Sequence, residues 1–193
     1  MISAILLAAG QSKRMSGENK LTKEIRNAPL IKHSVKNILD SSIDELIVVL
    51  GYQKEIIQKL IDNSEKIKFV FNKNFENGMA SSIKTGLNNL SEKTEAFFIC
   101  LGDMPMINHD IYNQLIKSKD NKEIIVPTYK GQQGNPVLFN KSMKEKIMNI
   151  AGDNGAKKIL ELNKDKILNL EINDQAIIET FNTQKDFSSL KPD

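Results

Sequence analysis

Short apolar runs alternate along the chain with stretches in which apolar residues recur every three or four positions. The continuous runs predict buried strands, and the wider spacing predicts amphipathic helices. On this basis we expect strands at 3–7, 44–50, 68–71, 96–101, 124–126, 136–139 and 167–172. We expect helices at 29–39, 53–61, 81–90, 108–117, 142–150 and 155–162, with Asn108 capping the fourth.

This alternation is typical of βαβ units, which build a mostly parallel sheet covered by helices on both faces. In open sheets of this kind, ligands bind beyond the carboxyl ends of the strands. Residues that directly follow a predicted strand are therefore the first candidates for a functional site.

The composition is that of a globular chain. Its 193 residues lie within the usual size of one domain, so we expect a single domain over 1–193. It is 40% hydrophobic and 26% charged, which excludes a disordered or fibrous chain. The net charge of +3 is too small to indicate binding to nucleic acid or to a membrane surface. No basic segment precedes the first apolar run, and no run approaches the roughly 20 residues of a membrane span, so we expect a soluble cytoplasmic protein.

The first candidate site is the loop after the first strand, 7–15 (LAAGQSKRM), with Lys20 beyond it. Gly10 has no side chain, so the backbone there allows a phosphate to approach closely. Arg14 and Lys20 add the positive charge that a triphosphate requires. An ordinary turn with two solvated cations is the alternative. Arg14 is one of only two arginines beside 25 lysines, which favours phosphate binding.

The second candidate is Asp103, which follows the strongly apolar segment 96–101. A carboxylate at the end of a strand can hold Mg²⁺ and leave positions for phosphate oxygens and water. Taken alone, an aspartate shortly before Pro105 is more typical of a helix or turn cap than of a metal ligand.

Three further segments combine glycine with polar residues. Segment 75–82 (FENGMASS) joins a strand to a helix and offers free N–H groups to an anion, although Ser81 or Ser82 would also serve as a plain helix N-cap. Segments 131–137 and 152–158 have the composition of functional loops and also of ordinary surface loops. The single cysteine, Cys100, lies in an apolar strand and indicates an inert core thiol.

Together and in this order, the segments resemble the MobA-like nucleotidyltransferases. The loop at 7–15, followed by Asn-Lys-Leu at 19–21, resembles the family as a whole. Four segments match the branch called MocA: GMASSI at 78–83, GDMP at 102–105, GNPVLF at 134–139 and GDNGA at 152–156.

The resemblance implies an α/β protein with the three-layer α/β/α Rossmann-like nucleotidyltransferase fold, a mostly parallel sheet and one antiparallel strand. It implies transfer of CMP from CTP to the terminal phosphate of molybdopterin or the molybdenum cofactor, with release of pyrophosphate and with Mg²⁺ as cofactor. In the family, Ala-Ala-Gly goes with cytidine and Ala-Gly-Gly with guanosine, so the sequence at 8–10 indicates CTP. A client molybdenum hydroxylase is the partner that the resemblance implies beside these substrates.

Carried over by position, the resemblance assigns three sets of residues. The catalytic set is Arg14, Lys20 and Asp103, with Asp103 as the Mg²⁺ ligand. The nucleotide-binding set adds Leu7, Ala8, Ala9, Gly10, Gly78, Ser81 and Ser82. The set that faces the pterin substrate is Gly134, Asn135, Pro136, Gly152, Asp153, Gly155 and Ala156.

The chain departs from the family pattern in two places. The family often has Gly-Lys-Pro-Leu before its first helix, where this chain has Asn-Ala-Pro-Leu at 27–30. The family also often has an aspartate, which could serve as a second metal contact, where this chain has Asn182. Because the guanylyl branch has asparagine in a similar place, this departure bears on the nucleotide more than on the enzyme class.

Three alternatives remain open from the sequence. Within the enzymes, they are a guanylyltransferase of the same family and a nucleotidyltransferase acting on another small-molecule phosphate. In a different class, the chain would be a non-catalytic chaperone that binds the molybdenum cofactor for a hydroxylase. Pyrophosphate release separates the enzymes from the chaperone, since a pure binding protein releases none.

Overall fold

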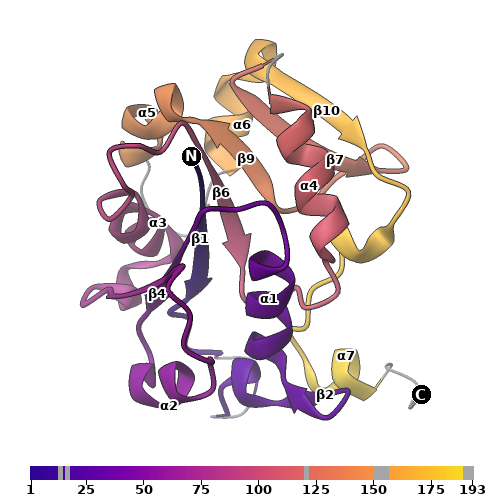
Figure 1. Ribbon diagram of the computed structural model, residues 1–193. Helices are drawn as coiled ribbons and strands as arrows, with labels where there is room; N and C mark the ends of the chain where they lie inside the picture. Colours follow the sequence, from indigo (N-terminus) through magenta and orange to yellow (C-terminus); the bar gives the residue numbers. More distant parts are fainter. Residues whose placement is uncertain (13–14, 16–17, 120–121, 150–156, 189–193) are drawn as a thin grey trace.

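The computed structural model describes residues 1–12, 15, 18–119, 122–149 and 157–188 (Figure 1). Its main sheet has the strand order β10-β7-β9-β6-β1-β4-β5, and the two-residue β8 pairs with β7. The strands of this sheet are β1 (Ile2–Ala8), β4 (Glu45–Leu50), β5 (Ile67–Phe71), β6 (Ala96–Leu101), β7 (Ile124–Tyr129), β8 (Gln132–Gln133), β9 (Val137–Asn140) and β10 (Ile167–Glu171). A separate hairpin consists of β2 (Glu24–Ile25) and β3 (Ala28–Pro29).

The sheet is mostly parallel. Strand β1 pairs in parallel with β4 and β6, while β9 runs antiparallel to both of its neighbours, β6 and β7. The expected single antiparallel strand is therefore confirmed within the strand order given above. The short strand β8, which lies outside that order, adds a second antiparallel pairing.

The central strand shows why the sequence forms this sheet. Along β1, Ala4 and Leu6 pack into the apolar cluster on one face, and Ile5 packs into the cluster on the other. A strand buried on both faces has no polar alternation, which is why it appears in the sequence as one apolar run.

Helices cover both faces. One cluster joins the sheet to α1 (Leu30–Leu39), α2 (Lys54–Lys59) and α4 (His109–Lys117). The other joins it to α3 (Met79–Leu87), α5 (Lys144–Met148) and α6 (Lys157–Leu162). Figure 1 shows α1 and α4 in front of the sheet, and α7 (Gln184–Ser188) beside β2 at the edge to which the β1 arrow points. Short 3₁₀ turns are η1 (Lys20–Thr22), η2 (Phe75–Asn77), η4 (Lys141–Met143), η5 (Lys164–Lys166) and η6 (Gln175–Ile177).

Every expected strand and helix has a counterpart, with boundaries that differ by a few residues. The helix expected at 81–90 begins at Met79, because Gly78 adopts a positive φ of 92° and turns the chain into the helix there. The helix expected at 142–150 divides into η4 and α5. Asn108 caps α4 as expected, by accepting the backbone N–H of Ile111 at 3.2 Å.

Cys100 has the structural role that the sequence indicates, and His33 makes a structural contact. Cys100 is 1% exposed in β6, and burial raises the pKa of its thiol to about 12. The His33 Nε2 lies 2.8 Å from the carbonyl oxygen of Ile25, which ties α1 to the β2–β3 hairpin. Within the described parts of the chain, no helix has both the length and the apolar character needed to cross a membrane.

Candidate active site

A cavity of about 300 Å³ opens at the carboxyl ends of the parallel strands. Loops after β1, β5 and β6 form its walls, as expected for a ligand site in an open α/β sheet. Its lining residues are Leu7, Ala9, Gly10, Gln11, Lys20, Leu21, Phe75, Glu76, Gly78, Met79, Ser82, Leu101, Gly102 and Asp103.

Lys20 and Asp103 form an ion pair in this cavity. The Lys20 Nζ lies 2.5 Å from Asp103 Oδ2 and donates a second hydrogen bond of 2.7 Å to the amide oxygen of Asn182. The side chains of Lys20 and Asp103 are 19% and 12% exposed, so the pair is partly shielded from water. The Lys20 ammonium therefore contacts a carboxylate oxygen of Asp103 and the amide oxygen of Asn182, and these three residues lie far apart in the sequence.

The turn η1 holds Lys20 in place. The Asn19 side chain caps this turn by accepting the backbone N–H of Leu21 at 3.1 Å. The backbone N–H of Lys20 donates to the Ser12 hydroxyl at 3.1 Å, which ties η1 to the chain that leaves β1. These two contacts fix where the Lys20 side chain starts.

Close packing at Gly102 positions Asp103. A Cβ at Gly102 would lie 2.9 Å from the Leu7 carbonyl oxygen, so only glycine allows β6 to pass β1 at this separation. The Gly102 carbonyl accepts the Ser34 hydroxyl from α1 at 3.1 Å. Among the described residues, Lys20 is the partner of the Asp103 carboxylate, and no backbone N–H donates to it, so the structure does not use Asp103 as a turn cap.

Asn182 comes from the C-terminal segment, which folds back to the site. Its amide nitrogen donates to the Thr180 hydroxyl at 2.7 Å, which leaves the amide oxygen directed at Lys20. The Asp186 carboxylate accepts the backbone N–H groups of Asn182 and Thr183, both at 2.7 Å, and so fixes the turn.

Of the five residues expected to bind nucleotide in the first loop, four are described, and three of these line the cavity. These are Leu7, Ala9 and Gly10, whereas Ala8 is 1% exposed and packs in the core. A Cβ at Gly10 would meet nothing within 4 Å, so the protein itself leaves open space beside this backbone. That space is what close approach of a phosphate requires.

The loop after β5 contributes Gly78 to the cavity, and the first turn of α3 contributes Ser82. The Ser82 hydroxyl accepts the Asn72 amide at 3.0 Å. Ser81 is not among the lining residues, and its hydroxyl oxygen lies 2.8 Å from the carbonyl oxygens of both Asn74 and Gly78, which share its single O–H. Ser81 therefore supports the turn into α3.

Gly134, Asn135 and Pro136 precede β9, whose antiparallel direction places its start near the carboxyl end of β6. They do not line the cavity. The Asn135 N–H donates to the Ile177 carbonyl at 2.8 Å, and a Cβ at Gly134 would collide with that carbonyl.

Some expected site residues lie outside the described residues. These are Arg14, Gly152, Asp153, Gly155 and Ala156.

The cavity also contains side chains to which the sequence analysis gave no role. Gln11 and Glu76 are joined by a hydrogen bond of 3.2 Å from Gln11 Nε2 to Glu76 Oε1, and Phe75 and Met79 add apolar surface. Each of the four lies in or beside a segment that the sequence marks as a candidate. The signal available was therefore proximity to a motif, and nothing in the pattern separates these positions from ordinary loop residues.

The chemistry of the site suits a divalent cation. Asp103 and Asn182 supply a carboxylate and an amide oxygen, the ligand types that Mg²⁺ prefers, and both already converge on one cation, the Lys20 ammonium. No group of three or more His, Cys, Asp or Glu side chains gathers among the described residues. A metal bound with few protein ligands, completed by water and phosphate oxygens, fits this arrangement.

Three curated relatives share similar lengths of this chain. The "Molybdenum cofactor cytidylyltransferase" of Escherichia coli (strain K12) is 31% identical over 72% of this chain and 70% of its own length. A "Probable molybdenum cofactor guanylyltransferase" of Methanosarcina mazei is 27% identical over 75% of this chain and 66% of its own length. The "Bifunctional protein GlmU" of Staphylococcus epidermidis is 23% identical over 72% of this chain but only 30% of its own length.

Solved structures show the same fold. Rv0371c from Mycobacterium tuberculosis superposes with a TM-score of 0.87 at 21% identity, covering 97% of this chain and 95% of that one. The manganese complex of Rv0371c gives a TM-score of 0.80 at 18% identity, covering 98% and 99%. A 4-diphosphocytidyl-2C-methyl-D-erythritol synthase from Anaerococcus prevotii gives 0.77 at 18% identity, covering 97% and 92%.

The family profile described as "MobA-like NTP transferase domain" matches residues 4–168, which include the cavity-lining loops after β1, β5 and β6. The chain therefore belongs to the MobA-like NTP transferase family and is a nucleotidyltransferase that uses a nucleoside triphosphate.

Proposed function

We propose that the protein transfers CMP from CTP to the terminal phosphate of molybdopterin or the molybdenum cofactor and releases pyrophosphate. The observation that carries this proposal is the Lys20–Asp103 pair, in the same cavity as Ala9 and Gly10. The identity to the Escherichia coli cytidylyltransferase and the Ala-Ala-Gly sequence at 8–10 support the cytidine assignment.

The proposed reaction is a direct displacement. A phosphate oxygen of the acceptor attacks the α-phosphorus of CTP, the bond from that phosphorus to the bridging oxygen breaks, and pyrophosphate leaves with the electron pair. The attacking phosphate is already ionised at neutral pH, so no general base is needed. The main obstacle is repulsion between two anions. Lys20, together with Arg14, would neutralise the charge that grows on the leaving pyrophosphate.

We assign the Mg²⁺ site to Asp103, with the Asn182 amide oxygen beside it. Mg²⁺ bound there would supply positive charge to the phosphate oxygens during the reaction. The manganese complex of the structural relative Rv0371c supports a divalent cation in this fold.

For the acceptor side, we keep Gly134, Asn135 and Pro136 as the described part of the pterin-facing surface. Their place before β9 puts them at the sheet edge where β6 ends, beside the loop that carries Asp103.

A guanylyltransferase is the second candidate. Asn182, where the cytidylyl pattern often has aspartate, favours it, as does the similarity to the Methanosarcina mazei protein. The two candidates share the fold, the site and the mechanism and differ only in the base.

The test is pyrophosphate release with purified molybdenum cofactor and Mg²⁺, in separate reactions with CTP, GTP, ATP and UTP. We expect release with CTP. Release with GTP instead would move the protein to the guanylyl branch. If none of the four gave release, molybdenum cofactor would not be the acceptor, and the proposal would be wrong.

A further inference from the structure

The cavity has two separate polar ends. Along the sheet edge the strand order is β6-β1-β4-β5, Asp103 follows β6 and Glu76 lies in η2 after β5. The turn η2 folds back over this edge, because a Cβ at Gly51, directly after β4, would lie 2.7 Å from the Cβ of Phe75, and Glu76 reaches Gln11 in the chain that leaves β1. A nucleotide whose phosphates lie at Lys20 and Asp103 has the Gln11–Glu76 pair as the other polar group along the walls of the same cavity.

The polar side chains that line the cavity are grouped accordingly. Lys20 and Asp103 form one pair, beside the end of β6, and Gln11 and Glu76 form the other, between the chain that leaves β1 and the turn η2. The fifth polar side chain, Ser82, already accepts the Asn72 amide. Among the described lining residues, Gln11 and Glu76 are thus the side chains positioned to contact a base.

Glu76 is an unexpected residue in a pocket for a polyanion. Within the described residues it forms no ion pair, and its contact is the single hydrogen bond from Gln11. Glu76 is exposed, so water solvates its carboxylate in the free protein, and a bound nucleotide has to replace that water. An uncompensated carboxylate repels a triphosphate unless it accepts an N–H from the ligand. The bases supply such a donor, and pairing of Glu or Asp with the cytosine N4 amino group is a known form of base recognition.

We propose that Glu76, with Gln11 beside it, reads the base by accepting a hydrogen bond from the exocyclic amino group of cytosine. This rests on the proposed function, because the cavity has to hold CTP. Cytosine presents an amino donor next to a ring-nitrogen acceptor, which matches a carboxylate next to the Gln11 amide donor. Uracil has the same size but presents a carbonyl oxygen at the amino position, and this oxygen repels the carboxylate. Phe75 and Met79 line the same end and offer apolar surface to the ring.

The test compares Glu76→Gln with wild type. A carboxylate only accepts, whereas an amide can present either its oxygen or its nitrogen, so the variant loses the distinction between the two pyrimidines. Titration calorimetry with CTP and with UTP, each with Mg²⁺, gives both affinities without requiring turnover. We expect wild type to bind CTP about 10- to 100-fold more tightly than UTP, as for a hydrogen bond to a charged group, and Glu76→Gln to lose most of that preference.

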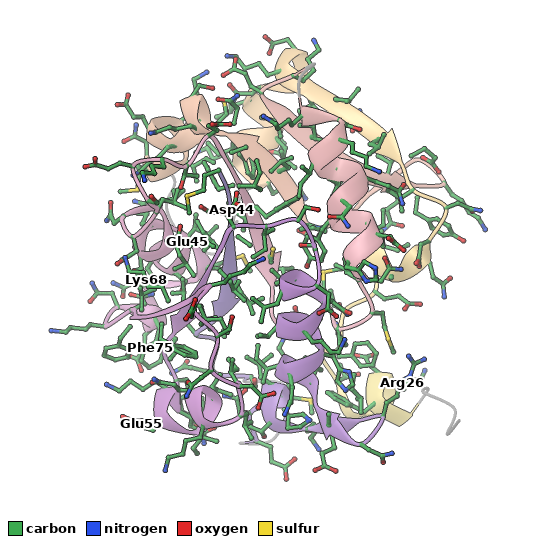
Figure 2. The ribbon with its side chains drawn as sticks, in the orientation of Figure 1. Arg26, Asp44, Glu45, Glu55, Lys68 and Phe75 are labelled. Atoms are coloured by element: carbon green, nitrogen blue, oxygen red, sulfur yellow. The ribbon has the colours of Figure 1, made fainter. Side chains whose placement is uncertain are left out.

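Glu55→Gln is the matched control. Glu55 lies on α2 at the outer edge of the molecule (Figure 2), its side chain is 71% exposed, and it does not line the cavity. The Glu55→Gln substitution removes the same charge, and the variant should keep the wild-type preference for CTP.

Other outcomes overturn the proposal. An equal gain in affinity for both nucleotides would show that Glu76 acts only as a repelling charge, and no change would show that it is a solvated surface residue. Both results leave the cytidylyltransferase assignment standing. Wild-type protein that binds neither nucleotide would overturn the base assignment and the proposed function together.

Discussion

Lys20 is the charge on which the polar groups of the site converge. Asp103 balances it with one carboxylate, and Asn182 adds an oxygen without adding charge. The cluster of these three side chains is therefore close to neutral, whereas an aspartate at position 182 would make it negative. A neutral cluster repels an incoming triphosphate less, so this chain is expected to depend less on metal ions for nucleotide binding than a two-carboxylate site.

Cys100 provides a prediction that tests the packing of the central strand. The thiolate is the reactive form of cysteine, and burial raises the pKa of this thiol to about 12. We expect the native protein to be inert to an aromatic disulfide reagent at about pH 8, below the usual thiol pKa. After unfolding in guanidinium, one thiol per chain should react, because the sequence has one cysteine. Rapid reaction of the native protein would contradict the buried position.

At the residue scale, the pattern predicts the groups that follow strands, whereas Asn182 stands out only through the family resemblance, and its contact with Lys20 is not predicted. Lys20 and Asp103 were predictable because parallel strands end at one edge, which brings their loops together. Contact of Asn182 with Lys20 depends on a turn fixed by Asp186 and Thr180, and no periodicity encodes that fold-back.

At the element scale, β7 and β10 are joined by side chains as well as by the sheet. The Thr128 hydroxyl donates to one Glu171 oxygen at 2.7 Å, and the Lys130 backbone N–H donates to the other at 2.8 Å. These two bonds, in that order of importance, lower the pKa of Glu171 below its ordinary value of 4.5.

This shift predicts a pH dependence of stability. Because the pKa of Glu171 is lower in the folded protein, the ionised carboxylate stabilises the fold above the unfolded-state pKa, and this contribution is lost as the pH falls through the folded-state pKa. We expect Glu171→Gln to lower the Tm near neutral pH, with a difference from wild type that shrinks as the pH falls below about 4.5. The exposed Glu161→Gln, on α6, is the control for loss of charge. A Tm difference that stays constant down to acid pH would contradict this account.

The elements that the sequence pattern did not predict depend on features that a pattern of apolar residues does not show. The β2–β3 hairpin turns through Arg26 and Asn27, which have positive φ values of 45° and 62°, and arginine gives no turn signal. Helix α7 is short, and the Asp186 contact that stabilises its start is not part of an apolar pattern. In contrast, the long buried strands and amphipathic helices were predictable because burial imposes a regular pattern on them.

At the scale of the whole molecule, strand order turns a linear series of motifs into one cavity. Strands β6, β1, β4 and β5 are adjacent in the sheet, so loops more than 60 residues apart in the sequence face one another, as the hydrogen bond from Gln11 to Glu76 shows. The segment at 134–136 was expected at the same site from its resemblance alone. It lies at the same edge but packs against Ile177, so its distance from the cavity depends on a tertiary contact that a motif does not encode.

The central claim is that Asp103 and Lys20, its ion-pair partner, form the catalytic centre. The most direct measurement is the rate of pyrophosphate release from CTP and molybdenum cofactor by wild type, Asp103→Ala and Asp103→Asn, with circular dichroism as the check on folding. Asp62→Asn, in the exposed Lys32–Asp62 pair, is the matched control. We predict that both Asp103 variants fold and that their rates of pyrophosphate release are about 10²- to 10³-fold lower than that of wild type. Asp62→Asn should keep the wild-type rate. Folded Asp103 variants with wild-type turnover would contradict the account.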